Sequence, residues 1–319
     1  MKKTIISIII LIVVTTCIVL IFTKKDKPSK EEGKIYITTS IYPVYDFTKE
    51  VAGDKATVSM LLPPGVDIHD YDPSTQDIAI IQDSDLFFYT SNDLEPWVQT
   101  ITSGLDNKSN IKSIANNIEL IDKEKFEEEY ITDEDEEENH EEHEKYDTHI
   151  WLDPTKSIIM VRNIQEKLSE ADPENSNYYK ENADNYIKKL QELDTSIIAT
   201  VKESSRDKIA FGGPFSYAYF IKRYDLQFVT AYDSCGEGNE PSVKKMYKVI
   251  EEVKKDNLPV VFYKELSSAN FAKRIAEETG AKCLEFNSLH TITKEQLKSG
   301  ENYLSIMYNN LENLKQALN

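Results

Sequence analysis

Short runs of β-branched and aromatic residues alternate along the chain with longer segments whose apolar positions recur at helical spacing. The predicted strands are 34–40, 57–63, 85–91, 207–212, 226–232, 258–265 and 281–287. The predicted helices are 42–53, 73–84, 216–226, 242–257, 268–280 and 301–318. Strands that alternate with helices predict parallel sheets covered by helices, which is an α/β fold.

One helical segment, 174–205, is much longer than the others and contains no Gly or Pro. Its apolar positions are Tyr178, Ala183, Tyr186, Ile187, Leu190, Leu193, Ile197 and Ile198. At about 1.5 Å per residue this helix extends over roughly 40 Å or more, which is enough to connect two lobes. We therefore predict two α/β lobes with parallel sheets, 34–157 and 206–319, joined by a linking region, 158–205, that contains the long helix.

Residues 1–33 are predicted to lie outside the fold. Two lysines precede an apolar run, 5–22, which is typical of an export signal, and a polar stalk follows. Cys17 is a candidate for lipidation, but the run is also close to the length that spans a bilayer. A lipoprotein and an uncleaved signal anchor both remain open. Either way, the rest of the chain is expected outside the cytoplasm and attached to the cell membrane.

Two further cysteines, Cys235 and Cys283, are candidates for a disulfide in an exported protein. Spacing alone does not bring two Cα atoms within reach, so their pairing stays open.

The chain is strongly acidic, with 56 Asp and Glu against 37 Lys and Arg and a net charge of −19. This charge argues against a nucleic-acid partner and favours a cation. The most acidic stretch, 122–147, has few apolar residues and no periodicity, so we predict a disordered loop. It carries His140 and His143, which suit a weak, cation-collecting arm; a solvated charge run explains them equally well.

A ligand is expected in the cleft between the two lobes, near the carboxyl ends of the strands. The other three of the five histidines are predicted in separate loops on the side of this cleft: His69 after the strand 57–63, His149 between the acidic loop and the next helix, and His290 after the last strand. A lone loop histidine is usually solvated, but histidines are scarce here and none falls on a predicted buried helix face. Neutral imidazoles from separate loops suit a borderline cation such as Zn²⁺. Four carboxylates are candidates for supporting these rings: Asp67, Asp70, Asp72 and Asp153.

The sequence gives no support for an enzyme, because it contains no nucleophile elbow, no phosphate-binding glycine loop and no HExxH motif. A zinc hydrolase is the alternative, since three protein ligands leave a position for water. No obvious general base accompanies the histidines, so we expect a binding protein.

Several stretches carry a resemblance to a known family. They include 41–97 with "GVDIHDYDPS", 147–154 (DTHIWLDP), 220–226 (FIKRYDL), 260–268 (VVFYKELSS) and 275–282 (IAEETGAK). The chain resembles the cluster A-I substrate-binding proteins of bacterial ABC importers for zinc and manganese, over nearly everything after the stalk. The resemblance implies a monomeric two-lobed clamp, a rigid interlobe helix, a metal in the cleft and docking on an ABC permease. The His- and acid-rich loop is typical of zinc-binding members.

By this resemblance, His69 and His149 match the first two metal ligands of the family. Pro214 stands at or near the position of the third, and Asn287 stands where the family has Asp or His. His290 resembles a histidine of a Gram-positive subgroup and is our substitute third ligand. Asn287 and Glu265 are auxiliary candidates, as are the two loop histidines. Glu265 also resembles a structural cap.

We therefore predict an extracytoplasmic protein that delivers Zn²⁺ to an ABC importer. One alternative is a manganese- or iron-binding protein. The lack of carboxylates at the expected ligand positions argues against this alternative, because these metals prefer oxygen ligands. Another is a surface adhesin that has lost transport-grade ligands. Because imidazole must be neutral to bind a metal, binding is expected to weaken below about pH 6.

Overall fold

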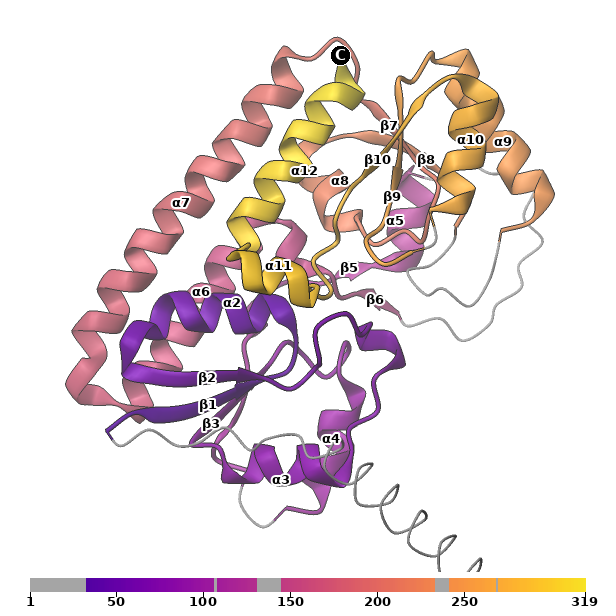
Figure 1. Ribbon diagram of the computed structural model, residues 1–319. Coiled ribbons are helices and arrows are strands. Elements are labelled where there is room, and N and C mark those ends of the chain that lie inside the picture. The colour runs from indigo at the N-terminus through magenta and orange to yellow at the C-terminus, as the bar shows by residue number, and fades with distance from the viewer. Residues whose placement is uncertain (1–32, 106–107, 131–144, 233–240, 268) are drawn as a thin grey trace, which may run out of the picture.

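A computed structural model describes residues 33–105, 108–130, 145–232, 241–267 and 269–319. Two four-stranded parallel sheets form two lobes (Figure 1). The first sheet has the order β2-β1-β3-β4 and comprises β1 (Ile35–Thr39), β2 (Ala56–Met60), β3 (Leu86–Tyr89) and β4 (Ile111–Ser113). The second has the order β10-β9-β7-β8 and comprises β7 (Lys208–Phe211), β8 (Gln227–Thr230), β9 (Val260–Tyr263) and β10 (Lys282–Glu285).

Helices connect the strands of each sheet, as parallel strands require. The first lobe contains α2 (Tyr42–Ala52), α3 (Thr75–Asp83) and α4 (Pro96–Ser103), with the 3-10 turns η1 (Gly53–Lys55) and η2 (Ile68–Asp70). The second contains α8 (Ala218–Tyr224), α9 (Val243–Lys255), α10 (Asn270–Thr279), α11 (Lys294–Ser299) and α12 (Tyr303–Leu318). Local signals set several helix starts. Ser74 and Asp77 form a capping box at α3, and Asn302 and Ser305 form one at α12.

Between the two sheets the chain forms a two-stranded antiparallel ribbon and two long helices. These elements are β5 (Ile121–Asp122), α5 (Lys123–Tyr130), β6 (Tyr146–Asp147), η3 (Ile150–Leu152), α6 (Pro154–Ala171), η4 (Pro173–Asn175) and α7 (Ser176–Glu203). Figure 1 shows α7 running along both lobes. It packs against α2 and α6 toward one end and against α12 toward the other. The prediction of two α/β lobes with parallel sheets and one long helix is confirmed.

One apolar core continues from the first lobe into the second. At the junction the rings of Phe47 in α2 and Tyr303 in α12 meet edge to face, with centroids 4.8 Å apart. Beside them the buried carboxylate of Asp46 accepts hydrogen bonds from the Tyr303 backbone N–H and the Tyr186 hydroxyl of α7. Helices from both lobes therefore share one packed junction.

The prediction of a disordered loop over 122–147 is wrong at both ends, because Asp122 belongs to β5 and Tyr146–Asp147 form β6. Residues Lys123–Tyr130 form α5, and Phe126 is buried against Phe215 and Phe228 of the second lobe, with ring centroids 6.3 and 5.9 Å apart. This one aromatic anchor, stacked on Tyr130 at 4.7 Å, holds a helix that is otherwise charged. Phe126 and Tyr130 are the two aromatic residues of this helix, and two positions are too few to show a helical periodicity in the sequence. Residues 131–144 lie outside the described residues.

Helix α6, which occupies the first part of the linking region, and strand β4 were not among the predicted elements. The division of the chain near 157 and 205 stays a prediction. The predicted anchor with Cys17 lies outside the described residues. In the part of the chain that the structure describes, no helix has both the length and the apolar character needed to cross a bilayer.

Candidate metal centre

Three histidines from three separate loops converge between the lobes. His69 lies in η2, which follows β2 of the first sheet. His149 lies two residues after the end of β6 and caps the start of η3. His290 lies in the loop after β10 of the second sheet. The parallel strands β2 and β10 end at this junction, so their following loops meet there.

The distances within the cluster suit a shared ion. Ligand nitrogens of the three rings all lie within 4.8 Å of one another. The ring centroids are 4.5 Å apart for His149 and His290, 5.3 Å for His69 and His290, and 5.9 Å for His69 and His149. Nitrogens bound to one tetrahedral Zn²⁺ are about 3.3 Å apart, given Zn–N bonds of about 2.0 Å. A small inward shift of the rings would therefore bring them to bonding distance.

The His149 ring is held from behind by Asp147. The Asp147 carboxylate accepts hydrogen bonds from the His149 backbone N–H at 2.8 Å and from ring Nδ1 at 3.0 Å. Both residues are buried. Burial raises the pKa of Asp147, but the nearby imidazole and its hydrogen bonds outweigh burial, so the pKa is lowered overall. A charged carboxylate on Nδ1 fixes the proton there and leaves Nε2 as the metal-binding nitrogen.

A chain of hydrogen bonds fixes the His290 ring in the same way. The Ser288 hydroxyl donates to Glu265 at 2.6 Å and lies 2.5 Å from His290 Nδ1. Because its one proton goes to the carboxylate, the serine oxygen accepts the proton of Nδ1. Nε2 of His290 is buried and has no hydrogen-bond partner among the described residues. A buried nitrogen with a lone pair and no donor suits a metal ligand.

The His69 loop is attached to the second lobe by two contacts. Asp67 accepts a hydrogen bond from the His69 backbone N–H and forms an ion pair of 3.0 Å with Lys264. The Gly65 backbone N–H donates to the Thr291 hydroxyl at 3.0 Å. His69 is the most exposed of the three rings. It therefore lies on the solvent side of the cluster.

Trp151 closes the cluster on the inner side. Its ring centroid is 5.6 Å from those of His149 and His290, and its indole N–H donates to the Ser288 carbonyl at 2.8 Å. The tryptophan is completely buried. An apolar wall beside the nitrogens excludes water and strengthens the electrostatics of a bound ion.

The structure gives the auxiliary candidates other contacts. Glu265 accepts hydrogen bonds from the Ser288 backbone, the Ser288 hydroxyl and the His290 backbone, so it caps this loop. The Asn287 side-chain oxygen accepts from the Leu289 backbone N–H. Cys283 in β10 is partly buried. The remaining candidates, His140, His143 and Cys235, lie outside the described residues.

One carboxylate that supports a ring was not among those the sequence suggested, and two of the suggested ones have other contacts. Asp153 caps α6 by accepting hydrogen bonds from the backbone N–H and the hydroxyl of Thr155. Asp67 accepts from the backbone N–H of His69 and pairs with Lys264. Asp147, which sequence reasoning missed, supports His149. Its position two residues before the histidine was the available signal.

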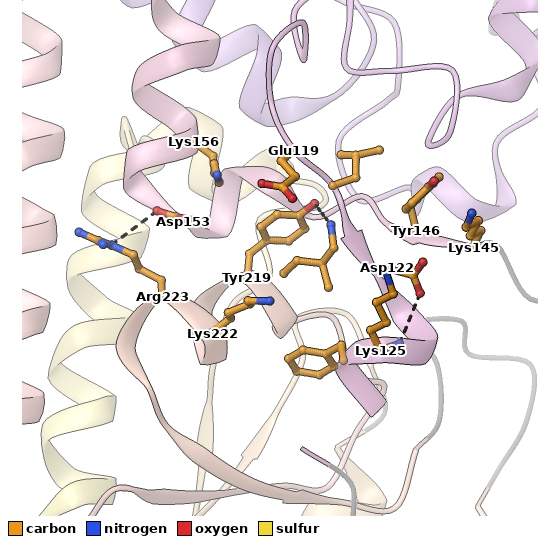
Figure 2. A pocket seen from close by; sticks show the side chains of 13 residues that line it. Glu119, Asp122, Lys125, Lys145, Tyr146, Asp153, Lys156, Tyr219, Lys222 and Arg223 are labelled. Carbon is orange, nitrogen blue, oxygen red and sulfur yellow. Dashed lines mark hydrogen bonds and ion pairs between the residues drawn. The ribbon is translucent and has the colours of Figure 1, made fainter. Parts of the chain in front are cut away.

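A separate cavity of about 680 Å³ lies beside this centre (Figure 2). Its charged lining comprises Lys125, Lys145, Lys156, Lys222, Arg223, Glu119, Asp122 and Asp153. Cationic side chains outnumber acidic ones, which disfavours a divalent cation. Tyr219 on its wall donates a hydrogen bond to the Asp147 carbonyl at 3.0 Å and accepts one from the Ile121 N–H. The cavity therefore lies next to Asp147, which supports His149, but it is distinct from the histidine cluster.

The two lobes, the long helix and the histidine cluster together define a metal-binding protein of the substrate-binding class. The family model described as zinc-uptake complex component A, periplasmic (ZnuA), matches residues 37–317. The chain belongs to this family, which is a family of solute-binding transport proteins.

Curated relatives and a solved structure agree with this assignment. The high-affinity zinc uptake system protein ZnuA of Bacillus subtilis is 34% identical over 297 residues, covering 93% of this chain and 91% of the relative. The zinc-binding lipoprotein AdcA of Streptococcus pneumoniae is 35% identical over 286 residues, covering 90% of this chain and 56% of AdcA. This chain therefore spans about half the length of AdcA. The crystal structure of the Zn(II)-bound ZnuA-like domain of that AdcA matches with a TM-score of 0.74 and 31% identity, covering 90% of this chain and 99% of the domain.

Proposed function

We propose that this protein binds Zn²⁺ outside the cytoplasm and delivers it to an ABC importer, with His69, His149 and His290 as the metal ligands. The observation that carries the proposal is the meeting of the three rings, with ligand nitrogens within 4.8 Å of one another. Asp147 and Ser288 support two of the rings through Nδ1 and so present Nε2 to the ion. Zinc-binding relatives that cover nearly the whole chain support the choice of cargo.

Zinc is favoured over manganese or iron by the ligand set. All three ligands are imidazole nitrogens, whereas Mn²⁺ prefers carboxylate and other oxygen ligands. Water or one further side chain completes a fourth position. The bound ion is cargo, and the protein acts as a monomeric binding protein, without catalysis.

Titration calorimetry of the full-length chain in detergent tests the ligand set. Wild-type protein is expected to bind one Zn²⁺ tightly, and His149→Ala or His290→Ala to weaken binding by at least roughly a hundredfold. The double variant His140→Gln/His143→Gln is the matched control and is expected to keep the high-affinity site. Wild-type protein that binds no zinc would overturn the proposal and favour the adhesin alternative.

The anchor is the second part of the proposal. Residues 1–33 are proposed to hold the protein at the outer face of the cell membrane, through lipidation of Cys17 or as an uncleaved apolar segment. A relative named as a lipoprotein supports the first form. Metabolic labelling with a palmitate analogue distinguishes the two. Label that is lost in Cys17→Ser indicates lipidation, and membrane association without label indicates the apolar segment.

Delivery requires a permease partner. Membrane vesicles that contain the cognate permease are expected to accumulate zinc only when loaded protein and ATP are present. The His149→Ala variant is the control. Equal zinc accumulation with this variant would show that transport does not depend on the histidine cluster.

A further inference from the structure

Tyr219 of the second lobe contacts both strands of the ribbon that leads to His149. It lies in α8, is buried, and faces the ribbon formed by β5 and β6 (Figure 2). Its hydroxyl accepts a hydrogen bond from the Ile121 backbone N–H at 3.0 Å and donates one to the Asp147 carbonyl at 3.0 Å. Ile121 and Asp147 are paired residues of the ribbon. One hydroxyl therefore attaches the end of the ribbon to the second lobe.

The ribbon carries the residue that orients His149. Asp147 is the last residue of β6, and its carboxylate accepts hydrogen bonds from the backbone N–H and from ring Nδ1 of His149. Tyr219, Asp147 and His149 are all buried. Asp147 thus receives the Tyr219 hydroxyl on its carbonyl and holds the imidazole with its carboxylate. Because both groups belong to one residue, a displacement of the carbonyl would also move the carboxylate.

A second contact connects the chain around His149 to the second lobe. The Trp151 indole N–H donates to the Ser288 carbonyl at 2.8 Å, and the Trp151 carbonyl accepts from the Tyr303 hydroxyl at 2.6 Å. Helix α8 also packs against η3. His149 precedes the long helix in the sequence, but it is held by the lobe that carries His290. The centroids of these two rings, 4.5 Å apart, are the closest in the cluster.

His149 thus lies between two anchors on the second lobe. Tyr219 holds the chain two residues before the histidine, and Trp151 holds it two residues after. The cavity of about 680 Å³ beside Tyr219 leaves space into which the ribbon can shift if the first anchor is lost. Water from this cavity can replace the lost hydrogen bonds, but it does not attach Asp147 to α8. Loss of the Tyr219 hydroxyl is therefore expected to give a folded protein with a displaced imidazole.

We propose that Tyr219 is a positioning residue for metal binding, which attaches Asp147 to the second lobe and so holds the His149 imidazole at its distance from His290. The tyrosine does not touch the ion. It acts through the Asp147 carboxylate, whose position sets the orientation of the ring and the nitrogen that faces the metal. The inference rests on the proposed zinc-binding function, with His149 and His290 as ligands.

Titration calorimetry of the full-length chain in detergent measures the effect of Tyr219→Phe, which removes only the hydroxyl. Zinc binding is expected to weaken roughly tenfold, because the support of the His149 ring is no longer held in place. The visible absorption of bound Co²⁺, which reports the geometry of the ligands, is expected to change in the same variant.

Tyr179→Phe is the matched control. The buried Tyr179 ring also loses a hydroxyl that forms a hydrogen bond, but its partner Asp172 follows the end of α6 that lies away from the cluster. This variant is expected to bind Zn²⁺ with wild-type affinity and to give the wild-type Co²⁺ spectrum. A purely structural role of Tyr219 predicts the same behaviour for Tyr219→Phe, with only a lower unfolding temperature of the metal-free protein.

A double variant tests the path through Asp147. Asp147→Ala removes the carboxylate, so nothing remains for Tyr219 to position. Asp147→Ala and Asp147→Ala/Tyr219→Phe are therefore expected to bind zinc equally. Independent contributions would instead multiply, and the double variant would bind roughly tenfold more weakly than Asp147→Ala.

Two results would overturn the inference while wild-type protein still binds zinc. One is wild-type zinc affinity in Tyr219→Phe, and the other is the multiplied loss in the double variant. If Tyr219→Phe does not fold, hydroxyl exchange in metal-free wild-type protein decides, measured by the deuterium isotope shift of the labelled Tyr219 Cζ. Slow exchange is expected, and rapid exchange would overturn the inference. Wild-type protein that binds no zinc would instead refute the proposed function.

Discussion

The hydroxyl oxygen of Ser288 lies 2.5 Å from Nδ1 of His290, while Nε2 of the same ring has no hydrogen-bond partner in the part of the chain that the structure describes. This contact and the Asp147 contact to His149 give two of the three rings the same tautomer. The metal centre therefore depends on groups that never touch the ion.

Replacement of Ser288 by Ala is expected to weaken zinc binding about tenfold to a hundredfold, because the His290 ring loses the acceptor that fixes its proton. Titration calorimetry measures the change. Ser299→Ala is the control, since that exposed hydroxyl donates only within its own helix turn. Unchanged affinity in Ser288→Ala would mean that the hydrogen bond does not orient the ring.

Asp147→Asn is expected to lower zinc affinity by about tenfold. The amide keeps an oxygen near Nδ1 of His149 but removes the negative charge that makes the imidazole a stronger ligand. Titration at several pH values gives the measurement. Asp184→Asn controls for the loss of one carboxylate, because Asp184 pairs with Arg162 and Lys180 away from the cluster. If both variants bind zinc equally well, the charge of Asp147 has no role.

The stability of the metal-free protein is expected to fall with rising pH because of Asp46. Burial, and secondly repulsion by Glu50, raise the pKa of Asp46 to about 7. The hydrogen bonds that Tyr303 and Tyr186 donate to Asp46 lower its pKa, but burial has the larger effect. Because the pKa of Asp46 is higher in the folded state, its protonation stabilises the fold. This stabilisation is fully present below the pKa of about 4 in the unfolded state and is lost as pH rises through 7. The loss amounts to at most about 4 kcal/mol, for a shift of about 3 units.

Chemical unfolding in EDTA at pH 5 and pH 8, followed by circular dichroism, measures this loss. Asp46→Asn keeps an oxygen that accepts both hydrogen bonds and removes the titration, so its stability is expected to change less between the two pH values. A variant with the same pH dependence as wild type would assign the effect to other groups.

Gly212→Ala is expected to destabilise the second lobe by about 1–3 kcal/mol through overpacking. A Cβ at Gly212, directly after β7, would lie 2.5 Å from the Cα of Ala272 in α10, and a backbone atom cannot move aside easily. Thermal unfolding measures the effect. Gly104→Ala is the matched control, because the nearest atom to its Cβ is 3.9 Å away. Equal stability of the two variants would show that α10 shifts freely.

The strands and the convergence of the histidines were predictable because their signals are local. Fully buried runs such as Leu86–Tyr89 identify strands by composition alone. Ligands of open α/β sheets bind at the carboxyl ends of the strands, so His69 and His290, which each follow a strand of a different lobe, were expected to face the same cleft. Their role as ligands stays a proposal.

The supporting contacts were not predictable because they depend on distant packing. Ser288 meets Glu265 across 23 positions, and Lys264 meets Asp67 across 197. Helix α5 depends on Phe126 reaching two aromatic rings of the other lobe. Neither composition nor periodicity of the segment carries that information.

Helix α7 limits how the protein can exchange its cargo. Its 28 residues are packed against α2 and α6 at one end and α12 at the other, and they contain no Pro or Gly at which to bend. A wide swing of the two halves would break this continuous packing. Access to the ion is therefore expected to come from displacement of the short segment around His69, over a few ångströms, while the framework stays still.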